Sequence, residues 1–323
     1  MIYSKTNHVP VLITKVLKLL DVKENGIYVD ATLGMGGYSK AILNSCLCQL
    51  ISIDRDPDSI INAQNKFKDF GKRFTAINGL FSNLENILND LGIKKINGIA
   101  FDFGISTPQL EDKHRGFSFS KDGPLDMRMS QSGLTAEEFI NKSEKKILIE
   151  TLKNFGEEKK ASRIASAIIN KRPLKSTKDL ANVIYSVLGN PKKNEINPAT
   201  RSFQAIRIAI NDELNEIQQA LSSSLKFLKP GGRIVAVSFH SLEDRIVKNI
   251  FSLNSYSNRN VNRHLPETND NNPVYLKPIT KKPIIPDENE ICENPRSRSA
   301  KLRAAERTQL PWLEKDRISM GAL

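Results

Sequence analysis

The stretch VDATLGMGGYSKAIL, residues 29–43, is the feature that most restricts the fold of this chain. An apolar run that contains a carboxylate enters it, a cluster of three glycines follows, and a helix-forming run leaves it. Glycine adopts backbone conformations that other residues avoid and lets a ligand approach the main chain. Such a cluster between a strand and a helix predicts a binding site at the carboxyl end of a parallel strand.

Strand-like and helical patterns alternate over the first third of the chain. Apolar runs at 26–32, 50–54, 74–78 and 96–104 predict buried strands, and the segments between them predict helices. Strands that alternate with helices through short links are typical of a parallel sheet covered on both faces. The sequence therefore predicts a doubly wound, Rossmann-like α/β fold.

The pattern changes after residue 104. Residues 110–198 carry helical periodicity, two capping-box signatures and no strand signal, so we expect an inserted all-helical domain there. The sheet domain is then divided into an N-terminal part, 1–109, and a C-terminal part, 199–323. One apolar stripe predicts a single long helix over 198–228, which is followed by a strand that returns the chain to the sheet.

The composition of the chain restricts the kinds of partner and compartment that we expect for this protein. The 323 residues carry a net charge of +12, which favours a polyanionic partner such as a nucleic acid, although a lysine-rich composition also serves solubility. Nothing resembles a signal peptide or a membrane span, so we expect a cytoplasmic protein without membrane contact. Only three cysteines are present, Cys46, Cys48 and Cys292, and this odd set without metal-ligand spacing predicts a reducing compartment and no metal site.

Two residues beyond the glycine cluster are candidate ligands of a nucleoside. Asp54 ends the second predicted strand, where a carboxylate can accept hydrogen bonds from ribose hydroxyls; a helix cap is the alternative. Phe81 follows the third predicted strand, where its ring can pack either against an adenine ring or in the hydrophobic core. A G-x-G-x-x-G dinucleotide fingerprint requires glycine at position 39, where this chain has Ser39. The pattern D-x-T-x-G-x-G-G at residues 30–37 instead resembles the first motif of S-adenosylmethionine methyltransferases.

The fourth predicted strand ends in Asp102, at the edge where a transferred methyl group would lie. A carboxylate at this place can accept a hydrogen bond from an exocyclic amine, and a buried structural aspartate is the alternative. Gln109 lies shortly afterwards and can bond to a cofactor or to a base. Asp102 is therefore the candidate catalytic residue.

Several longer motifs together resemble the RsmH (MraW) family of methyltransferases. They span nearly the whole chain in order: HVPVL, DATLGMGGYS, IDRDP, FDFGISTPQLED, RGFSF with DGPLDMRM, NPATRSFQAIRIAIN, KPGGRIVAVSFHSLEDRIVK and ENPRSRSAKLRAAER. The resemblance implies methylation of N4 of one cytidine in 16S ribosomal RNA of the small ribosomal subunit. It also implies S-adenosylmethionine contacts at Gly36, Gly37, Tyr38, Asp54, Phe81, Asp102 and Gln109.

The chain departs from the family pattern at several positions. Tyr38 stands where histidine is usual, Ala31 where glycine is usual and Thr107 where serine is usual, and GEEKK at 156–160 differs from the usual Gly-Glu-Glu-Arg run. We expect the contact at Tyr38 to be made by the backbone, so that the exchange is tolerated while any role of a histidine side chain is lost.

Basic side chains supply candidate RNA contacts. We predict such contacts at Arg201, Arg207, His240, Arg296, Arg298 and Arg303. Solvated arginines, or arginines paired with Asp126 or Glu243, are the alternative, and His240 with Ser238 also suits a structural hydrogen-bonded pair. The sequence leaves open whether naked RNA or an assembled subunit is the substrate, and whether the chain forms a homodimer.

Other functions remain as alternatives. These are a methyltransferase acting on DNA or a small molecule, a dehydrogenase, and an RNA-binding scaffold that has lost catalysis. Ser39 counts against the dehydrogenase, and the combination of Gly36, Gly37, Asp54 and Asp102 counts against the scaffold.

Overall fold

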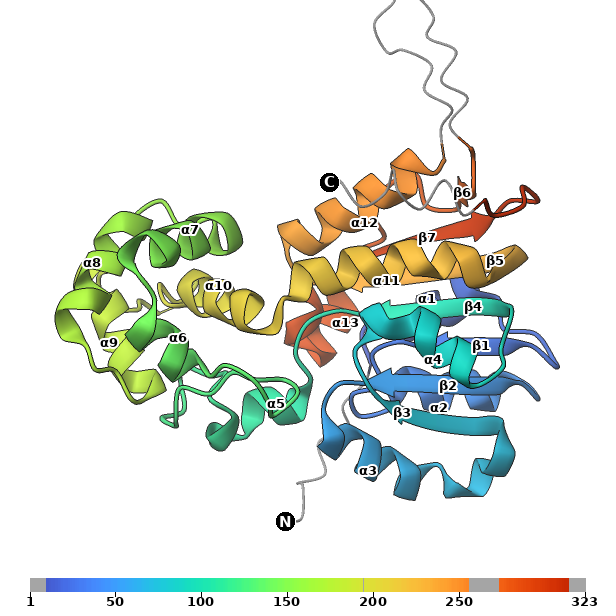
Figure 1. The fold of residues 1–323 in the computed structure, drawn as a ribbon, viewed down its shortest axis with the longest axis horizontal. Helices are drawn as coiled ribbons and strands as arrows, with labels where there is room; N and C mark the ends of the chain where they lie inside the picture. Colours follow the sequence, from blue (N-terminus) through green and yellow to red (C-terminus); the bar gives the residue numbers. More distant parts are fainter. Residues whose placement is uncertain (1–9, 194, 256–272, 314–323) are drawn as a thin grey trace, which may run out of the picture. The chain divides into compact units, whose positions relative to one another are not determined.

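The chain forms two compact units in a computed structural model that describes residues 10–193, 195–255 and 273–313 (Figure 1). The first unit contains the described residues up to Gly104 and from Leu214 onward. The second unit is Ile105–Glu213. The helical unit therefore extends further along the chain than the segment 110–198 that we predicted.

A seven-stranded sheet forms the centre of the first unit. Its first five strands are parallel, β7 runs antiparallel to β5, and β6 runs antiparallel to β7. In sheet order the strands are β3 (Phe74–Asn78), β2 (Gln49–Asp54), β1 (Ile27–Asp30), β4 (Ile96–Asp102), β5 (Leu228–Ser238), β7 (Lys301–Arg307) and β6 (Leu276–Pro278). The predicted α/β sheet is thus confirmed, with an antiparallel edge.

Helices cover both faces of this sheet because successive side chains of a strand point to opposite faces. Val29 and Ile51 pack in one core with α4, α11 and α12, whereas the preceding residues Tyr28 and Leu50 pack in another core with α1, α2 and α3. The helices of this unit are α1 (Ile13–Leu20), α2 (Gly37–Ser45), α3 (Pro57–Lys66), α4 (Leu84–Asp90), α11 (Glu213–Phe227), α12 (Ser241–Leu253) and α13 (Glu288–Glu293), with 3₁₀ turns at Lys68–Arg73, Phe81–Asn83 and Pro295–Ser299.

The strand order places a crevice at the centre of the sheet. From β1 the chain proceeds outward through β2 to β3 and then returns to β4 on the other side of β1. Ligands of open α/β sheets bind at the carboxyl ends of strands where the order reverses in this way. The ends of β1, β2 and β4 carry Asp30, Asp54 and Asp102.

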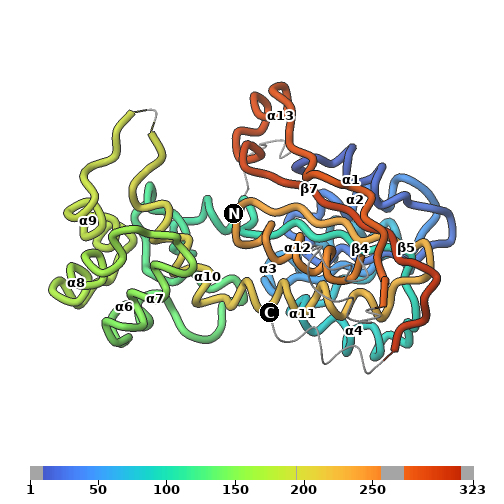
Figure 2. The backbone as a smooth tube through the Cα atoms, turned by 90° about the horizontal axis from the view of Figure 1, so that it is seen from above, coloured from blue at the N-terminus to red at the C-terminus, as the bar shows by residue number. Residues whose placement is uncertain are grey.

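The second unit is built from helices around its own apolar core. The core includes Ile140, Leu152, Ile164, Leu180 and Ile206, one from each of five helices, all nearly inaccessible to solvent. The helices are α5 (Thr107–Glu111), α6 (Ala136–Lys142), α7 (Lys145–Gly156), α8 (Ala161–Lys171), α9 (Thr177–Leu188) and α10 (Thr200–Asn211), with a 3₁₀ turn at Lys113–Arg115. Figure 2 shows the helices α6 to α10 of this unit, coloured from green to yellow.

The prediction of one long helix over 198–228 was wrong. The segment forms α10 and α11, and the break lies at Asp212, whose backbone is left-handed with φ +51°. The apolar stripe continues across the break, so its period gave no sign of it. The end of the motif ENPRSRSAKLRAAER forms strand β7 (Lys301–Arg307).

Candidate active site

The glycine turn, residues 34–37, leads from the end of β1 into α2. Gly34 and Gly36 have φ values of +49° and +73°, in the left-handed region that favours glycine. A Cβ on Gly36 would lie 2.5 Å from the Phe67 ring, and one on Gly37 would lie 2.2 Å from Cγ of Pro10. Because Gly36 offers no capping side chain, the turn presents the N–H groups at the start of α2 to a ligand.

Asp54 connects the end of β2 to this turn. One carboxylate oxygen accepts a hydrogen bond from the N–H of Gly34 at 2.7 Å, and the other accepts from the N–H of Asp56 at 2.8 Å. Burial raises the pKa of Asp54 to about 6, although both hydrogen bonds favour the charged form. A carboxylate has about four acceptor positions, so Asp54 retains capacity to accept from two hydroxyls of a ligand.

Hydrogen bonds join three buried polar side chains near the turn, those of Asp30, Ser39 and Ser52. Asp30 is inaccessible to solvent and accepts a hydrogen bond from the Ser39 hydroxyl at 2.6 Å, and Ser39 in turn lies 2.8 Å from the Ser52 hydroxyl. Burial raises the pKa of Asp30 above its usual value. Sequence reasoning used Ser39 only to reject a dinucleotide fingerprint and assigned no role to Asp30, although its place at a strand end was a signal.

Asp102 carries an unsatisfied acceptor at the end of β4. Among the residues that the structure describes, its buried Oδ1 has no hydrogen-bond partner, while its backbone N–H donates to the Thr32 hydroxyl. Burial raises the pKa of Asp102 well above its usual value, and the negative charges of Asp30 and Glu243 add to this effect. A buried carboxyl oxygen without a partner is costly in a folded protein, which points to a ligand that satisfies it.

Glu243 fixes the segment that follows β5. It is fully buried at the start of α12, and its Oε2 accepts from the N–H groups of Phe239 and His240 at 2.7 and 3.3 Å. The His240 ring completes this capping box, because its Nδ1 accepts from the Glu243 N–H at 3.4 Å, and its Nε2 lies 3.1 Å from Oε1 of Glu243. These contacts favour the structural alternative for His240. The sequence analysis considered Glu243 only as a partner of an arginine and missed this capping role, although its position three residues after a possible cap was a signal.

The aromatic candidate Phe81 lies at the edge of the first core. It follows β3 and meets Phe101 edge-on, at 6.1 Å between ring centroids and 83° between planes, with Phe103 beside it. The residue is only partly buried against this core. Its ring therefore suits either alternative that the sequence left open, an adenine contact or core packing.

The side chains of Tyr38 and Gln109 both form hydrogen bonds within the protein. Tyr38 is 4% exposed, and its hydroxyl donates to the Val11 carbonyl at 2.6 Å. The side chain is thus part of the fold of the first unit, which the sequence did not indicate. Gln109 belongs to the second unit, where it forms a capping box with Ser106 at the start of α5.

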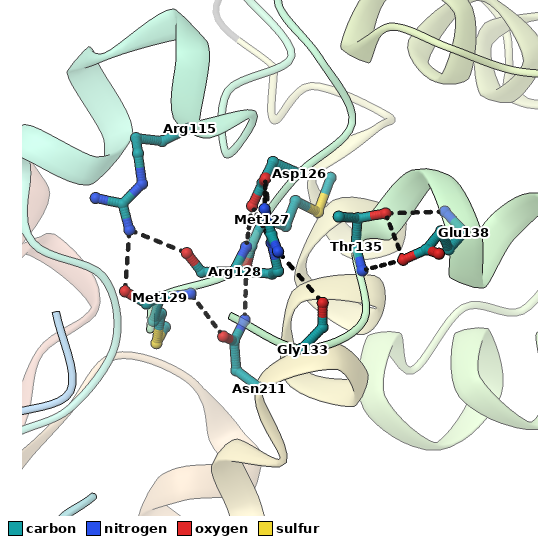
Figure 3. Close-up of polar contacts among 9 residues, drawn as sticks. All are labelled: Arg115, Asp126, Met127, Arg128, Met129, Gly133, Thr135, Glu138 and Asn211. Carbon is teal, nitrogen blue, oxygen red and sulfur yellow. Dashed lines mark hydrogen bonds and ion pairs between the residues drawn. The ribbon is translucent and has the colours of Figure 1, made fainter. Parts of the chain in front are cut away.

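A polar network fixes an irregular segment of the second unit (Figure 3). The Asn211 amide donates to the Met127 carbonyl at 2.7 Å and accepts from the Met129 N–H at 2.8 Å. Arg115 donates to the carbonyls of Arg128 and Met129. Met127 has a left-handed backbone, with φ +59°. A non-glycine residue in this conformation persists only where its surroundings impose it, which these hydrogen bonds do.

The basic candidates differ in their surroundings. Arg207 forms two hydrogen bonds to the buried Glu213, and Arg303 forms two to Asp244. Burial acts to raise the pKa of Asp244, but the positive charges of Arg303 and Lys301 lower it by more. The pKa of Asp244 therefore lies below its usual value. These pairs favour the structural alternative for both arginines. In contrast, the side chains of Arg201, Arg296 and Arg298 are exposed.

Two absences concern the described part of the chain. Within residues 10–193, 195–255 and 273–313, no three His, Cys, Asp or Glu side chains are grouped so that they could hold a metal ion. None of the helices described there is long and apolar enough to cross a membrane.

The charge of the crevice limits what it can bind. Asp30, Asp54 and Asp102 end three adjacent strands, and burial raises the pKa of each. Such a set favours a cationic ligand, whose charge offsets the cost of ionising buried carboxyl groups. It disfavours a dinucleotide, whose pyrophosphate would bring more negative charge.

A family model and similar protein sequences agree on one family. The model of the MraW methylase family matches residues 5–308. The ribosomal RNA small subunit methyltransferase H of Rhodospirillum rubrum is 44% identical over 313 residues, with 95% of this chain and 96% of that protein covered. The protein of the same name from Bradyrhizobium diazoefficiens is 43% identical, with coverage of 98% and 96%. An rRNA methylase structure from Streptococcus thermophilus aligns with 92% of this chain and 95% of its own, at 11% identity and a TM-score of 0.41.

The family match and these two relatives each extend over nearly the whole sequence, and the relatives correspond to it over almost their full length. The chain belongs to the MraW methylase family.

Proposed function

We propose that this protein transfers a methyl group from S-adenosylmethionine to the exocyclic N4 amine of a cytidine in small-subunit ribosomal RNA. The observation that carries the proposal is the buried Oδ1 of Asp102, which has no hydrogen-bond partner among the described residues and lies at the carboxyl end of β4. The relatives' names supply the class of RNA.

The residues of the crevice fit the proposed donor. S-adenosylmethionine carries a sulfonium, an ammonium and a ribose diol, and it lacks a pyrophosphate. At Gly36 and Gly37 the turn has no room for a Cβ and leaves backbone N–H groups for a ligand. Asp54 has acceptor positions for the diol, and the buried carboxyl groups favour a cation. When bound, this donor supplies an electrophilic methyl group.

Asp102 supplies what the amine requires. The N4 lone pair of cytosine is conjugated with the ring, which makes the amine a weak nucleophile. An acceptor at one of its hydrogens favours the geometry in which the lone pair is free to attack, and acid–base assistance of this kind typically contributes 10²–10⁴-fold to a rate. The burial that raises the pKa of Asp102 also makes it a stronger proton acceptor once it is ionised.

The test is methyl transfer with product identification. Purified protein is incubated with methyl-labelled S-adenosylmethionine and one acceptor in each of three parallel reactions. The acceptors are small ribosomal subunits from cells that lack this chain, naked 16S RNA and duplex DNA. We expect label in small-subunit RNA, recovered as N4-methylcytidine by nucleoside mass spectrometry. Label only in DNA, or in a different nucleoside, would overturn the proposal. Binding of RNA without transfer would favour the scaffold.

The comparison between subunits and naked RNA also decides which form is the substrate. A cytoplasmic location and a homodimer stay predictions. Sedimentation at several concentrations tests the dimer.

A further inference from the structure

The segment Pro10–Leu12 lies against the glycine turn of the first unit. A Cβ on Gly37 would lie 2.2 Å from the Pro10 ring, so the proline and the first residue of α2 are already in close contact. Position 37 therefore needs glycine partly because of this segment. Any movement of Pro10 changes the packing on the turn that presents N–H groups to the donor.

Two side chains from distant parts of the sequence hold this segment. The Tyr38 hydroxyl donates to the Val11 carbonyl at 2.6 Å, and the Leu12 N–H donates to Oε1 of Glu290. Tyr38 lies in α2, directly after Gly37, whereas Glu290 lies in α13 near the other end of the chain. The segment is thus fixed on one side from the turn itself and on the other side from α13.

The backbone of the segment is strained where the second bond is made. Leu12 has φ +54° and ψ +27°, a left-handed conformation that a leucine rarely adopts. Its side chain is buried, at 2% exposure. A backbone outlier of this kind persists because its surroundings impose it, and such outliers concentrate at functional sites.

Tyr38 is suited to act as a permanent donor. Burial raises the pKa of its hydroxyl well above the usual value, and the charges of Asp102, Asp30 and Glu290 add to this. The hydroxyl therefore stays protonated over the physiological range and keeps its bond to Val11.

We propose that Pro10–Leu12 is a positioning element of the donor site, and that Tyr38 and Glu290 act through it to fix the glycine turn at Gly37. Neither side chain needs to touch the donor. This inference rests on the proposed function, since it concerns the affinity for the methyl donor.

The test measures binding of S-adenosylhomocysteine by isothermal titration to the full chain. Tyr38→Phe removes only the hydroxyl, and loss of one such hydrogen bond should weaken binding about fivefold. Tyr185→Phe is the matched control, because it removes a hydroxyl that bonds to Asn197 in the second unit. We expect its affinity to equal that of the wild type.

Glu290→Ala reaches the same segment from α13 and serves if Tyr38→Phe does not fold. Glu290→Gln keeps an acceptor oxygen for Leu12 and should restore most of the affinity. Hydrogen exchange of peptides that contain Leu12 should accelerate in Tyr38→Phe and Glu290→Ala, and the KM for the donor should rise by a larger factor than turnover at saturating donor falls.

The outcomes separate this inference from the function. If the wild type binds S-adenosylhomocysteine and both Tyr38→Phe and Glu290→Ala bind it equally well, the inference is overturned while the proposed function stands. The inference also fails if Tyr185→Phe loses as much affinity as Tyr38→Phe. If the wild type itself does not bind the compound, the proposed function is overturned and the inference with it.

Discussion

The carboxylate of Asp54 accepts a hydrogen bond from the backbone N–H of Gly34 at 2.7 Å. This bond joins the end of β2 to the glycine turn after β1, so the residue predicted to bind the donor also shapes the place where the donor binds. Its charge state therefore controls two properties at once, the geometry of the turn and the capacity to accept hydrogen bonds from a ligand.

Donor affinity should depend on pH through Asp54. Burial raises its pKa to about 6, so the carboxylate is mainly charged above that pH and becomes protonated below it. We expect the affinity for S-adenosylhomocysteine, measured by titration calorimetry, to be level between about pH 7 and 8 and to fall as the pH drops through 6. Asp54→Asn should weaken binding about tenfold at neutral pH. Asp90→Asn, the same change at an exposed position in α4, should leave the affinity unaltered.

The same pKa predicts a pH dependence of stability with the opposite sign. A carboxyl group whose pKa is higher in the folded than in the unfolded protein stabilises the fold at low pH, and this contribution is lost as the pH rises from the usual 3.8 through about 6. The full loss corresponds to about 3 kcal/mol in the free energy of unfolding. Urea unfolding of wild type and Asp54→Asn at pH 5 and pH 8 measures it. The wild type should lose about 1 kcal/mol more than the variant over this interval; equal changes would contradict the prediction.

Turnover should depend on Asp102 more than donor binding does. Asp102→Asn keeps the size of the side chain and replaces the carboxylate with an amide that is a poor proton acceptor. We expect a fall in turnover of about 100-fold or more at saturating donor and RNA. The affinity for S-adenosylhomocysteine should change less than turnover. If the two fell by the same factor, Asp102 would be a donor-binding residue without a role in accepting the amine proton.

The sequence predicted the sheet and its ligand edge because both depend on local patterns. Apolar runs marked β1 to β4, and strand-end carboxylates such as Asp54 and Asp102 follow directly from them. The break at Asp212 was missed because a single left-handed residue does not interrupt the apolar period. The pairing of Arg303 with Asp244 was missed because the two residues lie 59 positions apart, on β7 and α12. Only the antiparallel addition of β7 to the sheet brings them together.

The Asn211 amide should be essential for the irregular segment of the second unit. Asn211→Ala leaves the Met127 carbonyl and the Met129 N–H without their partner in a buried place. Each unsatisfied group costs about 1–3 kcal/mol, so we expect the free energy of unfolding to fall by about 2–6 kcal/mol. Urea unfolding checks this, with Asn170→Ala at an exposed position of α8 as the control. A loss equal to that of the control would show that the left-handed turn at Met127 is stable without the amide.

RNA binding should distinguish exposed arginines from paired ones. Arg201 is exposed near the start of α10, with one long contact of 3.4 Å to the Glu157 carbonyl, whereas Arg303 is held by Asp244. If Arg201 contacts a phosphate, Arg201→Gln reduces the slope of log affinity against log salt by about 0.7, the value for one contact to single-stranded RNA.

Filter binding of small-subunit RNA over a range of salt concentrations measures this slope. Lys142→Gln, which removes an exposed charge paired with Glu138, is the control and should leave the slope unchanged. Arg303→Gln should instead lower the free energy of unfolding, because it leaves Asp244 with Lys301 as its remaining cationic partner at 3.5 Å. An unchanged slope in Arg201→Gln would remove that residue from the RNA interface, and a reduced slope in a stably folded Arg303→Gln would place Arg303 there despite its ion pair.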